Sequence, residues 1–445
     1  MARVIPIHPE REGAASLGHP LSREGGRGEG SAPAAGSPKG TSCGAPSQGG
    51  GSQQAASAAS LGHPLPREGG RGEGAIPLSL YIHFPWCVRK CPYCDFNSHE
   101  ARASIPEADY LAALIDDLEA ALPQVWGRRV AIVFIGGGTP SLLSAAGVDA
   151  LLAAVRARLT LVPGAEITLE ANPGAIEAEK FSAFRDAGVN RISLGIQSFD
   201  DRRLAALGRI HTGDEARSAI ESALEAFDNL NLDLMYALPN QGLEDARSDL
   251  GTALSFAPPH LSAYQLTLEP NTPFHHAPPS LPDDELAADM QEMIEETLAS
   301  AGYQHYETSA FALPGARCAH NLNYWNFGDY LGIGAGAHGK LSSHQGIVRE
   351  ARRRGPRDYL QGDFLQERRA VAAGDLPFEF MMNALRLTEG FPIRLFEERT
   401  GLPLAVAAEA IDQARRQGLL AVDDLRVAPT SRGQRCLNEL LQLFL

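Results

Sequence analysis

Three cysteines lie within eight residues of the chain, and their spacing is that of a ligand set. The segment YIHFPWCVRKCPYCDFNSH places Cys87, Cys91 and Cys94 in a C-x3-C-x2-C pattern directly after a predicted strand. Three thiolates can bind three irons of a 4Fe–4S cube and leave the fourth iron open. An open iron can take the amino and carboxylate groups of S-adenosylmethionine (SAM), and one electron then breaks a carbon–sulfur bond to give methionine and a 5′-deoxyadenosyl radical. The motif therefore predicts radical chemistry on SAM.

The alternative is a zinc site in which His83 or His99 completes the set of three thiolates. Structural zinc sites usually combine a C-x2-C pair with a second, distant pair, whereas Cys43, Cys318 and Cys436 are scattered. A disulfide framework would spread its cysteines more evenly along a shorter chain. The spacing thus favours a cluster over zinc and over disulfides.

The elements that must position this loop alternate between strands and helices. Strands are predicted at 78–84, 130–135, 166–171, 191–196, 230–236 and 261–266, with helices around 111–122 and at 144–159, 175–187, 213–226 and 242–254. Successive β-then-α units imply a parallel sheet that is covered by helices. Six units are fewer than the eight of a closed barrel. We therefore expect an α/β fold, a partial and open (β/α)6 barrel whose ligands lie beyond the carboxyl ends of the strands.

Polar and flexible residues stand at two of these strand ends. GGGTP at 136–140 follows the second strand, where glycines let the backbone approach a ligand and free N–H groups can bind a carboxylate. The alternative is an ordinary tight turn between a strand and a helix. Glu170 ends the third strand, where it could accept hydrogen bonds from ribose hydroxyls or an ammonium group, or else cap the next helix.

The chain divides into four regions, predicted as 1–75, 76–280, 281–374 and 375–445. The first is glycine-rich and contains ASLGHPLSREGGRGEG and its near-copy ASLGHPLPREGGRGEG, so we expect it to be disordered because it has little apolar surface to bury. A small binding motif in the repeat is the alternative. The second region is the barrel, and the third holds the segment HNLNYW and the glycine-rich LGIGAGAHG. The last is predicted to be an α-rich, winged-helix-like domain.

The charge balance excludes some classes of partner. The net charge of −15 argues against non-specific binding to nucleic acid or to an anionic membrane. Winged-helix domains often bind DNA, but residues 376–445 carry eight Lys and Arg against nine Asp and Glu, so we expect no nucleic-acid partner. No apolar run approaches the roughly 20 residues that span a bilayer, and MARVIPIHPE lacks the apolar core of a signal peptide. A cytoplasmic location is expected.

The cysteine motif, its YIHFPW lead-in and GGGTP resemble the radical SAM family, and most closely its oxygen-independent coproporphyrinogen III oxidase branch, over about residues 77–445. The resemblance implies that Gly137, Gly138 and Thr139 hold the methionine end of SAM. It implies further SAM contacts, some of them to a second SAM molecule, from Tyr81, Tyr93, Glu170, Gln197, Arg209 and Asp233. The alternative for Arg209 is a surface ion pair with Asp201.

The chain departs from the oxidase pattern at one position. The oxidases continue as C-x3-C-x2-C-x-C, and here Phe96 stands where their fourth cysteine would be. This variant resembles instead the haem-chaperone subfamily, the HemW type, whose signature continues C-D-F-N-S. HNLNYW at 320–325 fits the H-N-x-x-Y-W pattern that is associated with haem binding in that subfamily.

The resemblance then implies roles within HNLNYW. His320 would ligate haem iron near the mouth of the barrel, after its last strand, with Asn321 orienting the imidazole. Tyr324 and Trp325 would offer aromatic surface to the porphyrin. The alternative is that the Tyr-Trp pair only packs the open edge of the barrel.

The function that these resemblances imply is that of a haem chaperone with three cofactors or ligands, a 4Fe–4S cluster, SAM and haem. Its expected partners are an acceptor haemoprotein, a small electron-donor protein such as flavodoxin or ferredoxin, and, through peripheral contact, a membrane haemoprotein. The alternative is an oxygen-independent coproporphyrinogen III dehydrogenase, which decarboxylates its substrate oxidatively through a 5′-deoxyadenosyl radical. Without the fourth cysteine we expect no such activity.

Overall fold

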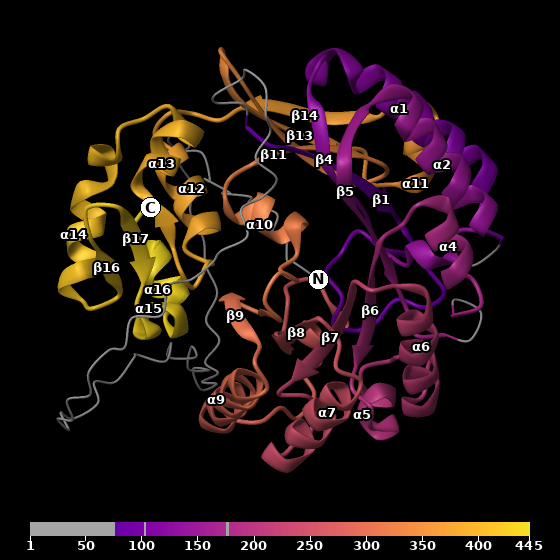
Figure 1. The fold of residues 1–445 in the computed structure, drawn as a ribbon, viewed down its shortest axis with the longest axis horizontal. Coiled ribbons are helices and arrows are strands. Elements are labelled where there is room, and N and C mark those ends of the chain that lie inside the picture. The colour runs from indigo at the N-terminus through magenta and orange to yellow at the C-terminus, as the bar shows by residue number, and fades with distance from the viewer. Residues whose placement is uncertain (1–75, 102–103, 175–177) are drawn as a thin grey trace, which may run out of the picture. The chain divides into compact units, whose positions relative to one another are not determined.

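A computed structural model describes residues 76–101, 104–174 and 178–445 of the chain. The predicted disordered leader, 1–75, and the start of the predicted 175–187 helix lie outside these ranges. Within them, a sheet of twelve strands has the order β14-β13-β12-β11-β1-β4-β5-β6-β7-β8-β10-β9 (Figure 1).

The centre of this sheet is parallel and follows the order of the chain. Its strands are β1 (Leu78–Phe84), β4 (Arg129–Gly137), β5 (Thr160–Ala171), β6 (Arg191–Gln197), β7 (Leu230–Tyr236) and β8 (His260–Gln265). Between them run α1 (Glu107–Val125), η1 (Pro140–Leu142), α2 (Ala145–Arg158), α4 (Phe181–Ala187), α5 (Asp201–Ala206), α6 (Gly213–Ala226) and α7 (Leu243–Ser255). Each neighbouring pair of these strands is parallel. The predicted partial (β/α)6 barrel is therefore confirmed.

Strand β6 has an apolar outer face and a polar inner face. In β6, Ile192, Leu194 and Ile196 belong to the main hydrophobic core with the covering helices. Arg191 and Ser193 alternate with them and are also buried, so they point to the other face of the strand. The alternation places a row of buried polar side chains inside the barrel, where ligands of a partial barrel bind.

Residues 281–374 extend both edges of the same sheet. β11 (Asp329–Ile333) joins β1 in parallel, and β12 (His338–Ser343), β13 (Gly346–Arg352) and β14 (Leu365–Ala370) continue antiparallel. β10 (Ala310–Ala312) and β9 (Gln304–Glu307) follow β8 at the other edge. The helices of this part are α9 (Asp284–Ser300), α10 (Ala319–Trp325) and α11 (Pro356–Tyr359), and α8 (Pro273–His276) precedes them. The predicted domain boundaries at 280 and 374 stay predictions. The large sheet includes strands from both sides of residue 280, so it does not separate at the first boundary.

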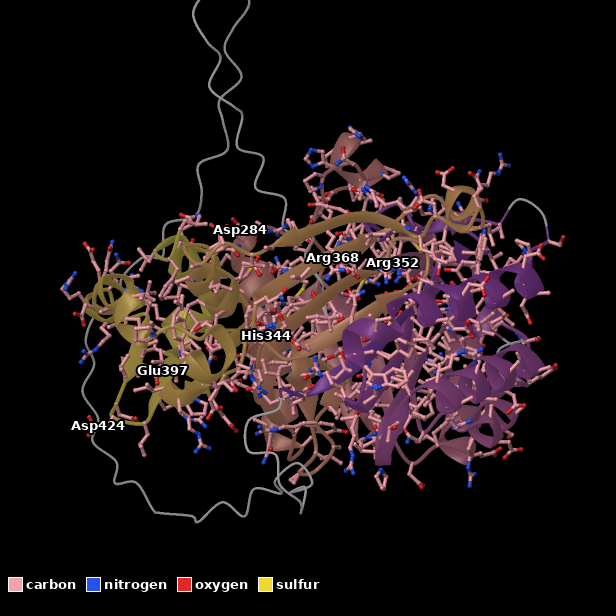
Figure 2. The ribbon with its side chains drawn as sticks, turned by 90° about the horizontal axis from the view of Figure 1, so that it is seen from above. Asp284, His344, Arg352, Arg368, Glu397 and Asp424 are labelled. Carbon is pink, nitrogen blue, oxygen red and sulfur yellow. The ribbon has the colours of Figure 1, made fainter. Side chains whose placement is uncertain are left out.

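An ion network whose members are buried except for Arg368 fastens one of these added strands to the barrel. Arg352 and Arg368, both labelled in Figure 2, reach the carboxylate of Glu350, with N–O distances of 2.8 and 3.4 Å. Arg352 also donates to Asp117 of α1 at 2.8 Å. Removal of one partner from such a network leaves an uncompensated buried charge, so these side chains hold β13 against α1.

The C-terminal region has its own hydrophobic core. It comprises α12 (Leu376–Ala384), β15 (Phe391–Pro392), α13 (Ile393–Thr400), η2 (Leu404–Ala407), α14 (Ala408–Arg416), β16 (Leu420–Val422), β17 (Arg426–Pro429), α15 (Ser431–Arg435) and α16 (Leu437–Gln442). The three strands form a small sheet in the order β15-β17-β16. Helices with a small antiparallel sheet match the predicted α-rich, winged-helix-like domain. No helix among the described residues is both long and apolar enough to span a membrane.

Candidate cluster and cofactor site

The cysteine loop leaves the carboxyl end of β1 and is closed at its base by a short parallel pair. β2 (Trp86–Cys87) pairs with β3 (His99–Glu100). Within the loop, the amide of Cys94 donates to the carbonyl of Cys91 at 3.1 Å. The thiols of Cys87, Cys91 and Cys94 are all half-buried, and none of the three forms a disulfide. One loop therefore presents three thiols at the end of the barrel where ligands were expected.

Each of these thiols has a polar side chain beside it. Arg209 donates to Cys91 Sγ at 3.7 Å, and Ser98 Oγ lies 3.6 Å from Cys94 Sγ. Burial raises the pKa of Cys87 to about 11, and a hydrogen bond with Thr139 opposes that shift. Hydrogen bonds to the sulfurs stabilise cluster thiolates and tune their irons. The donor set thus fits a 4Fe–4S cluster.

The zinc alternative loses one of its two proposed histidines. Both ring nitrogens of His83 are engaged, Nδ1 with the hydroxyl of Tyr81 at 2.8 Å and Nε2 with the carbonyl of Asn97 at 3.0 Å. Nε2 of the second histidine, His99, lies 3.3 Å from Asn97 Oδ1. Among the described residues, no group of three or more His, Cys, Asp or Glu side chains is arranged to hold a single metal ion.

The GGGTP turn packs against the cysteine loop. Its backbone amides were expected to be free, but they are hydrogen-bonded. Gly137 donates to Glu170 Oε2 at 3.1 Å, Gly138 to the carbonyl of Phe84 at 2.6 Å, and Thr139 to that of Trp86 at 2.8 Å. The pairing of β4 with β1 continues past the strand end and uses these donors. A Cβ on Gly138 would lie 2.5 Å from the Trp86 carbonyl oxygen, so glycine is needed for this close approach. The turn therefore positions the cysteine loop.

Sequence reasoning missed Asn172. Its side chain connects Arg209 and Thr139, the two residues that contact the thiols of Cys91 and Cys87. It accepts from Arg209 at 2.6 Å and donates to Thr139 Oγ1 at 3.0 Å. Arg209 also donates to the carbonyl of Gly195 at 2.8 Å. The only sequence signal for Asn172 is its place just after the third strand, in EANP. The alternative of a surface ion pair between Arg209 and Asp201 is wrong. The guanidinium of Arg209 is engaged at the cysteine loop, and Asp201 accepts from the amide of Gly213.

The predicted acidic residues face the barrel interior. Glu170 is buried, and its bond to Gly137 replaces the helix cap that we considered. Burial, with a smaller contribution from the nearby charge of Asp233, raises the pKa of Glu170 to about 7. Asp233 accepts from Ser193 Oγ at 3.0 Å and from Asn231 Nδ2 at 2.9 Å. Two carboxylates thus lie in an interior where a cation would be stabilised.

Three other predicted SAM contacts lie near these groups. Gln197 is buried and has a φ of 69°, a left-handed conformation that is unusual for a residue with a side chain. Tyr81 is bonded to His83, and burial raises the pKa of its phenol. Tyr93, within the cysteine loop, has its ring centroid 6.4 Å from that of Phe274. Local strain of the Gln197 kind is common at functional sites.

HNLNYW lies within α10 (Ala319–Trp325), and its His320 is buried inside the barrel rather than placed at its mouth. The ring of His320 stacks on Phe134 of β4 at a centroid distance of 3.9 Å. Glu166 of β5 accepts from the amides of Ala319 and His320, both at 3.0 Å. Because α10 packs against β1 and β4, the segment occupies the interior. This corrects the expected position of His320.

The imidazole of His320 is chemically available for coordination. Burial, together with the charge of Arg191, lowers the pKa of His320 to about 3, so the ring is neutral. Its Nδ1 has no hydrogen-bond partner. Asn321 Oδ1 contacts the thiol of Cys318 at 3.4 Å, so the expected role of Asn321 in orienting the imidazole does not appear. A neutral imidazole is the form that ligates a metal.

The aromatic residues of HNLNYW extend from this ring toward the C-terminal region. The ring of Tyr324 lies 4.6 Å from that of His320 and 4.4 Å from that of Tyr330. Arg386 lies over the ring of Trp325 at 4.5 Å. Both aromatic side chains are buried, so packing accounts for them in this structure, and a porphyrin contact remains a proposal.

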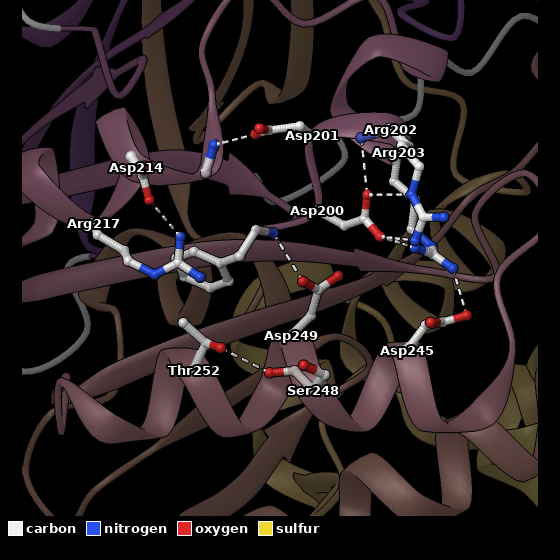
Figure 3. Close-up of a pocket in the computed structure, with 12 residues that line it drawn as sticks. Asp200, Asp201, Arg202, Arg203, Asp214, Arg217, Asp245, Ser248, Asp249 and Thr252 are labelled. Carbon is white, nitrogen blue, oxygen red and sulfur yellow. Dashed lines mark hydrogen bonds and ion pairs between the residues drawn. The ribbon is translucent and has the colours of Figure 1, made fainter.

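A separate surface pocket of about 380 Å³ lies among α5, α6 and α7 (Figure 3). Its charged side chains pair with each other, Arg203 with Asp200 and Asp245, and Arg217 with Asp214. The predicted site residues do not line it. We assign it no role.

Comparison with known proteins gives a consistent result. A family model described as the radical SAM superfamily matches residues 81–252, and one described as the HemN C-terminal domain matches residues 371–435. A protein of Escherichia coli (strain K12) named heme chaperone HemW is 52% identical over 371 residues, which cover 83% of this chain and 98% of that protein. Its namesake in Haemophilus influenzae is 50% identical over 375 residues, with 83% and 98% covered.

A solved structure supports the fold. The coproporphyrinogen III oxidase HemN from Escherichia coli, described as a radical SAM enzyme, matches with a TM-score of 0.72 at 24% sequence identity. The match covers 83% of this chain and 90% of that chain.

Proposed function

The chain belongs to the HemW-type branch of the radical SAM family, and on that premise we propose that it is a haem chaperone. In this proposal it binds a 4Fe–4S cluster, SAM and haem, and it delivers haem to acceptor haemoproteins. One observation carries the proposal. The barrel that presents three thiols at its strand ends also encloses a neutral imidazole, His320, whose Nδ1 is unbonded.

The cluster would be held by Cys87, Cys91 and Cys94. The chemistry that such a cluster supplies to bound SAM is one-electron cleavage of a carbon–sulfur bond. Glu170 and Asp233 would hold the ribose hydroxyls or the ammonium group of SAM, because carboxylates accept such donors strongly. The remaining SAM-binding residues of the proposal are Tyr81, Tyr93, Gly137, Gly138, Thr139, Gln197 and Arg209.

Haem would be ligated by His320, with Tyr324 and Trp325 beside the porphyrin. A single imidazole ligand gives haem a defined but exchangeable position, which suits a carrier better than permanent ligation on both axial sides. The proposed partners are an acceptor haemoprotein, which includes a membrane haemoprotein contacted peripherally, and a flavodoxin- or ferredoxin-like electron donor. We place the protein in the cytoplasm, where thiols stay reduced.

Anaerobic reconstitution followed by separate titrations with SAM and with haem tests this function. We expect about four irons per chain, a reducible cluster whose spectrum changes when SAM is added, and saturable haem binding with a defined Soret band. The matched control is a similarly sized apolar-rich protein without the motif, titrated with the same haem stock. If the chain binds haem no more tightly than that control does, the chaperone proposal is wrong.

We predict no conversion of coproporphyrinogen III to protoporphyrinogen IX, even with reduced cluster and SAM present. The reason is that Phe96 stands at the position where the oxidases carry a fourth thiol. The loop holds this residue through its carbonyl, which accepts from Lys90 Nζ at 3.1 Å and from the amide of Ser98 at 2.7 Å. The assay is anaerobic product analysis with an active oxidase run in parallel. Decarboxylation that depends on Cys87, Cys91 and Cys94 would support the dehydrogenase instead.

A further inference from the structure

Four side chains form one row across the inner face of the barrel. The strand pairings match Tyr81 with Phe134, Phe134 with Thr168, and Thr168 with Arg191. Residues in register on neighbouring strands point to the same face of a sheet. The ring of His320 stacks on Phe134, so this face is the interior that α10 occupies. The row therefore brings two aromatic rings, a hydroxyl and a guanidinium to one surface beside His320.

Arg191 ends this row as a buried cation with an unused N–H donor. It is only 2% exposed, and its Nε has no hydrogen-bond partner. In the described part of the chain, no carboxylate lies within ion-pair distance of Arg191, and Glu166 and Asp233 act on its charge from farther away. Both carboxylates are already engaged, Glu166 by the two α10 amides and Asp233 by Ser193 and Asn231.

Two further polar atoms near Arg191 lack partners. Thr168 is fully buried with its Oγ1 unbonded, and His320 Nδ1 is unbonded as well. Buried polar atoms are nearly always satisfied in folded proteins, and an unpaired buried charge is costly. A guanidinium fork beside a hydroxyl matches a carboxylate, which accepts several charge-assisted hydrogen bonds at once. The unsatisfied set thus indicates an anionic ligand.

We propose that Arg191 and Thr168 form a carboxylate-binding subsite inside the barrel, and that it takes a propionate of haem bound at His320. The inference rests on the proposed haem-binding function. The rings of Tyr81 and Phe134 make the part of the row beside His320 apolar, with Phe134 stacked on the imidazole, so the guanidinium and hydroxyl at its other end are left for the propionates, the only charged side groups of haem. The carboxylate of SAM is the other source of this chemistry, and the experiment separates the two.

The test compares haem with its dimethyl ester, in which both propionates are esterified, by titration of the full-length chain. Wild type should bind haem about tenfold more tightly than the ester, because hydrogen bonds to a charged group are strong. Arg191→Gln should lower haem affinity to that of the ester and leave ester affinity unchanged. Thr168→Val, which keeps the shape of the side chain, should reduce the preference for haem over its dimethyl ester two- to threefold.

Arg203→Gln is the matched control. Arg203 is also buried, but it lies on α5, pairs with the N-cap residue Asp200 and is outside the row, so this variant should keep the full preference for haem. Wild-type protein that binds haem and ester equally overturns the subsite, while wild-type protein that binds neither contradicts the proposed function itself. Loss of SAM binding in Arg191→Gln with the haem preference intact also overturns the proposal, because it assigns Arg191 to the SAM carboxylate. These outcomes can be read even if Arg191→Gln fails to fold, since wild type and Thr168→Val carry the comparison.

Discussion

Iron content should fall from about four atoms per chain to near zero when Cys87, Cys91 or Cys94 is replaced by alanine. Each thiolate ligates one iron of the cube, and two thiolates from a half-buried loop leave two irons without a protein ligand. The Arg209 and Ser98 contacts to Cys91 and Cys94 would then lose the charged sulfur that they stabilise. The measurement is iron and acid-labile sulfide after anaerobic reconstitution, with the absorbance and spin-resonance spectra of the reduced protein.

Cys318→Ala is the control for this series. Its thiol is buried beside Asn321, and burial raises the pKa of Cys318 to about 12, so it stays protonated and is a poor ligand. The variant should retain about four irons. Wild-type protein that contains stoichiometric zinc and no sulfide would contradict the cluster and with it the radical chemistry.

The parallel half of the fold could be predicted from sequence because its signals are local. Strand β7 and helix α6 occupy the predicted residues, Leu230–Tyr236 and Gly213–Ala226. The helix is marked by a capping box in which Thr212 and Glu215 bond each other's backbone amides, and the strand by the alternation of leucines with polar residues in LNLDLMY. Both kinds of signal lie within a few residues of the element that they define.

The edges of the sheet have no such local signal. Strand β11 pairs with β1 through Leu78 and Asp329, which lie about 250 residues apart in the chain, and β9 and β10 are only a few residues long. Short strands have too few residues to show a clear alternation, and their existence depends on the partner that they meet. The sequence of 281–374 therefore indicated a different region but not its place in the sheet.

The candidate site shows the same contrast between features that neighbouring residues define and features that depend on contacts distant in the chain. Thiol spacing was enough to predict the cluster loop, because the ligands are adjacent in the chain. The bonds of Asn172 to Arg209 and Thr139, and the use of the Gly138 amide by Phe84, depend on how three strands are registered. The position of His320 was wrong for a related reason, since α10 is seven residues long and its burial is decided by the strands around it.

Haem and cluster binding should be separable by two substitutions. His320→Ala should shift the Soret band and weaken haem binding about tenfold without eliminating it, because burial of the porphyrin supplies most of the affinity. The cluster should survive, since its ligands lie on a separate loop at the strand ends. Cys91→Ala should do the reverse, removing the cluster while leaving haem uptake largely intact. The measurement is a pair of titrations, of haem and of iron, on both variants.

The burial of His320 sharpens this experiment. Its ring stacks on Phe134, and the amides of α10 are held by Glu166, so alanine removes a ligand and also a packed aromatic contact. Phe134→Leu is therefore the second control, because it removes the stacking partner while keeping the imidazole. If the imidazole is the ligand, Phe134→Leu keeps the wild-type Soret position and His320→Ala does not. An unchanged spectrum and affinity in His320→Ala would mean that another residue ligates the iron, and equal Soret shifts in both variants would assign the effect to packing.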